Sequence, residues 1–129
     1  EAIVEALSPV APLSCNDGFL RDDALLVITF LTDEEDDVES PGDPVTWKAA
    51  VLDAKGGNED AVVVLGLLGD TGVAGGVCGF AEDAPRLRTF AESFTFGDWG
   101  SICSPSYAAF FDAAVEQIDV ACEMLGPRG

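Results

Sequence analysis

Two apolar runs of nearly equal length limit the folds open to this chain. Residues from Ala24 to Leu31 read ALLVITFL, and residues 61–68 read AVVVLGLL. Continuous runs rich in β-branched residues are typical of strands buried on both faces, as in parallel sheets. Between them, residues 45–55 show the helical spacing of apolar side chains and end at a Gly-Gly pair. The order strand, helix, strand predicts two parallel strands joined by a crossover helix.

Three further helices and a short strand complete the predicted order. We expect helices over residues 1–8, 85–94 and 105–125, and a third strand over residues 100–103. With 129 residues, the chain is long enough for one domain with its own core. The predicted fold is a single α/β domain, residues 1–129, with a Rossmann-like, mostly parallel sheet and flanking helices. The last helix is expected to bury a stripe formed by Tyr107, Phe111, Ala114, Val115, Ile118, Cys122 and Leu125.

The net charge of the chain limits the kinds of molecule that it can bind. The chain has 24 acidic and 6 basic residues, a net charge of −18 and no histidine. Such a field repels nucleic acid and favours cations, basic partners or solubility in high salt. Without histidine, the chain lacks the commonest general base and any Ser–His or Cys–His catalytic pair. No apolar run approaches the ~20 residues of a membrane span. We therefore expect neither nucleic acid binding nor a membrane span.

The four cysteines predict disulfides in an oxidising compartment, the alternative being buried free thiols. Cys103 and Cys122 lie about 28 Å apart along the predicted helix, too far for a disulfide. Cys78 and Cys103 both follow strands, so they lie at the carboxyl edge of a parallel sheet. We predict a Cys78–Cys103 disulfide, and Cys15–Cys122 is a second possible pair at the opposite edge.

The loop after the first strand is the candidate metal site. Residues 33–39 hold six carboxylates, and carboxylate oxygens are ligands for Mg²⁺ or Ca²⁺. In an open parallel sheet, ligands bind beyond the carboxyl ends of the strands. The candidate metal ligands are Asp33, Glu34 and Asp36, and we expect weak Mg²⁺ or Ca²⁺ binding or none. The glycine-rich loop over residues 69–83 does not open a helix as a dinucleotide-binding motif must.

Several segments resemble one family. Thr32-Asp33 at the end of an apolar strand resembles the third metal-site loop of von Willebrand factor A-type domains. The likeness continues through residues 16–26, residues 31–37, Arg86-Leu87 through Phe90, Phe96-Gly97 and Ser101-Ile102-Cys103. The chain looks like the C-terminal half of such a domain, of the kind found in bacterial (myxobacterial-like) secreted proteins and lipoproteins. Asp33 matches one metal ligand of that family, but the Asp-x-Ser-x-Ser loop is not in this sequence. The resemblance thus implies an incomplete domain with a partial metal-ion-dependent adhesion site.

These features together predict a binding or adhesion module, secreted or at the cell surface, and not an enzyme. One alternative is a Mg²⁺-dependent phosphoryl-transfer or receiver-like domain, which needs a lysine after a strand; Lys48 and Lys55 lie in or just after a predicted helix. The other is an acidic structural spacer. The expected partner is a protein ligand or the missing N-terminal half of the same domain. An uncovered edge from Ala24 to Leu31 also allows a homodimer through that strand.

Overall fold

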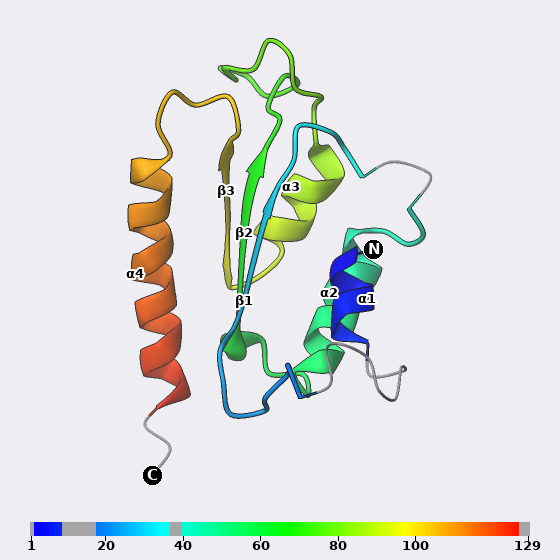
Figure 1. Cartoon of the computed structure of the whole chain (residues 1–129), viewed down its shortest axis with the longest axis vertical. Coiled ribbons are helices and arrows are strands. Elements are labelled where there is room, and N and C mark those ends of the chain that lie inside the picture. The colour runs from blue at the N-terminus through cyan, green and yellow to red at the C-terminus, as the bar shows by residue number, and fades with distance from the viewer. Residues whose placement is uncertain (1, 9–17, 37–39, 127–129) are drawn as a thin grey trace.

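The computed structural model describes residues 2–8, 18–36 and 40–126, and Figure 1 shows its architecture. Three parallel strands form one open sheet in the order β1-β2-β3. This confirms the predicted α/β fold with a parallel, Rossmann-like sheet. The elements in chain order are α1 (Ala2–Leu7), β1 (Leu26–Leu31), α2 (Pro44–Ala54), the 3₁₀ helix η1 (Glu59–Ala61), β2 (Val62–Leu68), α3 (Pro85–Glu92), β3 (Phe96–Ser101) and α4 (Ala108–Leu125).

The helices form two unequal layers on the sheet. α1, α2 and α3 lie together on one face, whereas α4 lies on the other, as Figure 1 shows. α2 and α3 are the crossover helices that return the chain to the amino edge before β2 and β3. A capping box begins α2, because the Asp43 carboxylate accepts from the Thr46 N–H while the Thr46 hydroxyl accepts from the Asp43 N–H.

The two predicted apolar strands differ in their surroundings. β2 is central, and all seven of its residues are buried, as its sequence predicts. β1 is an edge strand in which buried and more exposed residues alternate. The prediction that this run is buried on both faces is wrong: Val27 is 41 % exposed and Leu31 is 58 % exposed. Among the described elements, α4 packs on β2 and β3 and leaves this face of β1 open.

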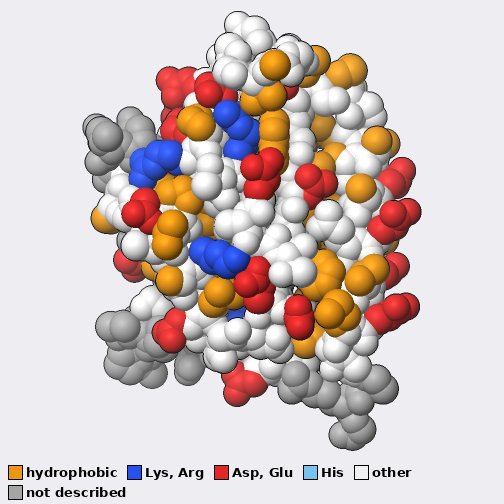
Figure 2. Space-filling view, turned by 180° about the vertical axis from the view of Figure 1, so that it is seen from behind, with side chains coloured by type: hydrophobic (Ala, Val, Ile, Leu, Met, Phe, Trp, Pro, Cys, Tyr) orange, Lys and Arg blue, Asp and Glu red, His pale blue; other side chains and the backbone are white. Residues whose placement is uncertain are grey.

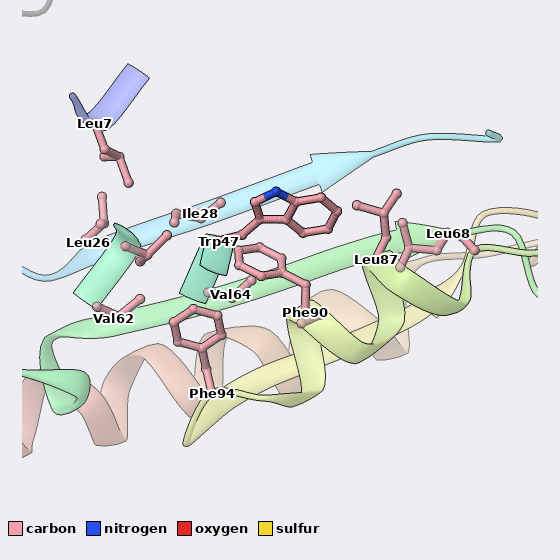
Figure 3. Close-up of a cluster of buried hydrophobic side chains, with 13 residues drawn as sticks. Leu7, Leu26, Ile28, Trp47, Val62, Val64, Leu68, Leu87, Phe90 and Phe94 are labelled. Carbon is pink, nitrogen blue, oxygen red and sulfur yellow. The ribbon is translucent and has the colours of Figure 1, made fainter. Parts of the chain in front are cut away.

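The larger core lies between the sheet and α1, α2 and α3 (Figure 3). Phe90 is its centre, since its ring contacts Phe30, Trp47 and Phe94 at centroid distances of 6.1, 6.1 and 5.3 Å. The contacts with Trp47 and Phe94 are edge-on, and such aromatic pairs add to the stabilisation from burial. The inward face predicted for α3 is confirmed, with Leu87, Phe90, Ala91 and Phe94 all buried.

The smaller core lies under α4, and the predicted stripe of this helix is in part wrong. Only Ala114 and Ala121 of α4 are fully buried there, against Val63, Leu65 and Phe96 of the sheet. Phe110 and Ile118 are partly buried in the same core. Phe111, Val115 and Cys122, which belong to the predicted stripe, are exposed. Apolar residues occupy most of the circumference of α4, so their spacing alone does not decide which line of residues packs on the sheet.

β3 also differs from its prediction, since it runs from Phe96 to Ser101 and not over residues 100–103. Its sequence, FGDWGS, has few residues that favour strands. Gly97 allows a close approach to the preceding helix end, because a Cβ there would lie 1.9 Å from the Ala91 carbonyl oxygen. Pairing with the buried β2 therefore makes this segment a strand despite its composition.

Candidate functional site

The carboxyl edge of the sheet gathers three loops, which follow β1, β2 and β3 (top of Figure 1). This is the edge at which the sequence predicts a site. The loop after β1 carries the acidic run, the loop after β2 is rich in glycine, and the loop after β3 leads into α4. Because all three strands are parallel, residues far apart in the sequence meet here.

Glu35 of the acidic run caps a helix. Its carboxylate accepts hydrogen bonds from the backbone N–H groups of Arg86 at 2.7 Å and Leu87 at 3.3 Å, at the start of α3. The first N–H groups of a helix have no partner within the helix, and a carboxylate there also interacts favourably with the helix dipole. Glu35 thus ties the loop after β1 to α3, a role that the sequence analysis missed because this cap comes from a segment 51 residues away.

The three predicted metal ligands lie around Glu35. Asp33 and Glu34 are exposed, and Asp36 is half-buried. The Asp33 carbonyl oxygen accepts from the Glu82 N–H at 2.8 Å, and the Asp36 carbonyl oxygen accepts from the Arg86 guanidinium. Within the described residues, no group of three or more potential ligands is placed to hold a metal ion. Asp37 and Glu39 of the same run lie outside the described residues, and the metal role of Asp33, Glu34 and Asp36 stays a prediction.

A disulfide joins Cys78 to Cys103, with the two Cα atoms 5.0 Å apart. This confirms the pairing predicted from the position of both cysteines at the carboxyl edge. Cys78 lies in the loop that leads to α3, and Cys103 lies in the loop that leads to α4. The disulfide therefore links the two helical layers above the end of the sheet.

Asp70, two residues after the end of β2, holds the Cys78 loop in place. Its side chain accepts hydrogen bonds from the N–H groups of Val77 at 3.0 Å and Cys78 at 2.8 Å, and the residue is only 5 % exposed. Burial acts to raise the pKa of Asp70, but these two hydrogen bonds and one from the Ser101 hydroxyl outweigh it and lower the pKa. The sequence analysis did not single out Asp70; the signal was an aspartate between a buried strand and a glycine-rich loop.

The basic side chains of the described part of the chain all have partners in the fold. Lys48 bonds to Glu59 at 3.0 Å, and Arg88 bonds to Asp83 at 2.5 Å. Lys55 is buried and donates to two backbone carbonyl oxygens, each at 2.7 Å. The remaining two are Arg21, which pairs with Asp23, and Arg86, which bonds to the loop after β1. Each of these cations is thus committed to an internal contact, and the remaining surface charge is strongly acidic.

The two other cysteines have no described disulfide. Cys122 carries a free, exposed thiol on α4. Cys15, its possible partner in the sequence analysis, lies outside the described residues.

A second candidate site is apolar and lies on the face of the sheet covered by α4. Val27 and Leu31 of β1 are exposed there, and so are Phe111 at 41 % and Val115 at 56 % on α4. We call these four residues the β1–α4 strip. Single exposed apolar residues are common, but several large ones on one face of a sheet favour a surface for interaction.

Comparison with known proteins adds no assignment: no family model, curated protein or solved structure matches the chain. Across the described residues, none of the helices has the length and apolar character to cross a membrane.

Proposed function

We propose that this protein is a non-catalytic protein-binding module and that the β1–α4 strip is its binding surface. The observation that carries this proposal is the exposure of four large apolar side chains on the face covered by α4, while the opposite face of the sheet is covered by three helices and holds the larger core. Burying such side chains contributes roughly 1.5–3 kcal/mol each when they go from full exposure to full burial. Because these residues are already partly buried, each would contribute about half of that free energy when a partner covers it.

The alternatives from the sequence fit the site less well. A phosphoryl-transfer or receiver-like domain needs a lysine at the end of a strand, but Lys48 lies within α2 and bonds to Glu59. Lys55 follows α2 and is held by carbonyl oxygens of the segment before β1. A spacer with only a structural role, in turn, gives no reason for the exposure of Val27, Leu31, Phe111 and Val115 to water.

The proposal includes a place outside the cell or at its surface. The Cys78–Cys103 disulfide supports it, since disulfides persist in oxidising compartments. The resemblance to von Willebrand factor A-type domains supports an adhesive role, with Asp33 as one ligand of a partial metal site. The partner is then a protein ligand, the N-terminal half of the same domain, or a second copy that pairs along the strand from Ala24 to Leu31.

Site-specific photo-crosslinking tests the binding function. A photoreactive residue is placed at Val115 in one variant and at Val45 in another. Val45 is also exposed, but it lies on α2 on the opposite face. In an extract of the source cells and their medium, we expect position 115 to capture a discrete partner that position 45 does not. Equal capture, or none, at both positions would contradict the proposal.

A further inference from the structure

The two sides of α4 are turned to different strands. Helix residues advance by 100° each, so Phe110 and the pair Phe111 and Val115 lie on opposite sides of the buried line through Ala114. Phe110 lies over β3, since a Cβ at Gly100 would be 3.0 Å from its ring. Phe111 and Val115 therefore leave α4 on its β1 side, with the Phe111 ring packed against the Phe110 ring at a centroid distance of 5.3 Å. The apolar side chains of β1 and α4 thus lie on the same face of the sheet as the partly buried Leu25 and Ile118, and we call this surface the groove.

The dimensions of this surface suit a helix. Val27 to Leu31 spans about 13 Å of strand, and Phe111 to Cys122 spans about 16 Å of helix, or three turns. Neighbouring helices pack 8–10 Å apart, about twice the spacing of strands. With α4 over β2 and β3, the next helical position on this face lies over β1. An extended peptide added to the β1 edge would pair with backbone groups and leave these side chains uncovered.

The apolar surface continues beyond the amino end of β1. A pocket of about 220 Å³ lies there, lined by apolar residues such as Phe19, Leu25 and Val27 and by the basic residues Arg21 and Lys55. Phe19 is itself exposed. A bound helix with a large apolar residue near one end can therefore place that side chain in the pocket, which would fix its position along the groove.

The rim of the groove is acidic. α4 carries four exposed carboxylates and no lysine or arginine, and Figure 2 shows the acidic row along its outer side. The carboxylates are Asp112, Glu116, Asp119 and Glu123. On the helical projection, Asp112 and Asp119 lie nearest to the β1 side. Asp33 and Glu34 are exposed just beyond the carboxyl end of β1, next to Leu31.

This charge pattern selects among the possible occupants. In a symmetric dimer through the strip, two α4 helices without basic residues would meet, and each chain has a net charge of −18. Like charges across an interface oppose association, whereas complementary charges speed it and favour the correct partner. An amphipathic helix of another protein, with lysine or arginine beside its apolar face, complements both the apolar groove and its rim.

We infer that the β1–α4 strip receives a basic amphipathic helix of about three turns from a partner protein. This inference rests on the proposed binding function and adds the chemistry of the partner. Helix-in-groove recognition places apolar residues at helical spacing in the groove, and the basic residues face the carboxylates. The Asp112 and Asp119 side chains would position the cations, and Val27, Leu31, Phe111 and Val115 would contact the apolar face.

Three synthetic helical peptides of 18 residues test this inference. They share one pattern of leucines at helical spacing and differ in the flanking residues, which are lysine, glutamine or glutamate. We expect the lysine peptide to bind the purified chain, the glutamine peptide to bind more weakly and the glutamate peptide not to bind. Affinity is measured by fluorescence anisotropy at low and high salt, and high salt should weaken only the lysine peptide.

Matched variants locate the site. Leu31→Gln and Val115→Gln should each weaken the lysine peptide by roughly tenfold, whereas Val45→Gln on the opposite face should not change it. The double variant Asp112→Asn with Asp119→Asn should weaken it by about two- to fivefold, and Glu5→Gln on α1 serves as its control. Circular dichroism of each variant checks that the fold is kept.

The outcomes separate the inference from the proposed function. If the lysine and glutamine peptides bind equally and both lose binding on Val115→Gln, the inference that the partner is basic is wrong, but the binding surface is supported. Binding that is unaffected by Leu31→Gln and Val115→Gln would overturn the groove itself. If light scattering shows a dimer that Val115→Gln disrupts, a second copy is the occupant and the inference fails. If no peptide binds, the inference also fails, and the crosslinking at Val115 still decides the binding function independently.

Discussion

The two faces of the sheet differ in how completely helices cover them. One face is covered by α1, α2 and α3, and its core centres on Phe90 with three aromatic neighbours. Among the described elements only α4 covers the other face, where it buries two alanines fully and leaves large apolar residues such as Phe111 and Val115 exposed. The same parallel sheet thus supports a packed face, which supplies stability, and a partly open face, which has apolar surface left for a partner.

The largest expected effect separates the two faces directly. Phe90→Ala should lower the free energy of unfolding by about 3–5 kcal/mol, because it opens a cavity in the main core. Phe111→Ala should lower it by less than about 1 kcal/mol, since that ring is already 41 % exposed. Urea unfolding of both variants measures the difference. Similar losses would mean that Phe111 is buried in solution and that the α4 face is not open.

The disulfide between the layers should have the next largest effect. Cys78 and Cys103 are 25 residues apart, and removing such a link costs about 3 kcal/mol. The double variant Cys78→Ser with Cys103→Ser should show this loss in urea unfolding, and hydrogen exchange should rise more in α4 than in β2. Cys122→Ser is the control, because that thiol is free and exposed. An unchanged stability of the double variant would show that the disulfide does not secure the α4 layer.

Asp70 should stabilise the same connection in a pH-dependent way. Its hydrogen bonds hold its pKa in the folded protein below the ordinary value of 3.8. The ionised carboxylate therefore stabilises the fold above that pH, and this contribution is lost as the pH falls below 3.8 toward the folded-state pKa. Asp70→Asn should cost about 1–3 kcal/mol at pH 7, because a buried N–H loses its acceptor. Urea unfolding at pH 7 and pH 3 should show that the difference in the free energy of unfolding between wild type and Asp70→Asn is smaller at pH 3. If this difference were the same at both pH values, the stabilisation would not come from the ionised Asp70 carboxylate.

The smallest expected effect concerns metal at the acidic loop. Calorimetry with Ca²⁺ and Mg²⁺ should give weak binding, with a dissociation constant on the order of 10⁻³ M, or no heat at all. Any heat should disappear in Asp33→Ala and persist in Asp60→Ala, whose carboxylate lies in η1 at the other end of β2. Micromolar affinity that survives Asp33→Ala would rule out the role given to Asp33 and would place a metal site elsewhere.

The parts of the fold that could be predicted share one property, a strong local pattern. β2 is apolar throughout and is buried on both faces, and α3 has a clear inward side. The Cys78–Cys103 disulfide followed from the placement of both residues after parallel strands. Glu35 and Asp70 could not be assigned in this way, because each acts through backbone N–H groups of another segment. Their roles depend on where the loops meet, and a single sequence does not show that.

The sequence by itself determined the α/β class, the parallel direction of the strands and the acidic character of the surface, because these follow from runs, spacing and counts of residues. Tertiary structure decided which apolar residues are buried. β1 and β2 both come from near-continuous apolar runs, yet of the two only β2 has a strand on each side and helices on both faces. Likewise, α4 has apolar residues around most of its circumference, and contact with β2 and β3 selects Ala114 and Ala121 while Phe111 and Val115 stay exposed. Burial is a property of the neighbours that a side chain meets, and the neighbours are fixed only when the layers assemble.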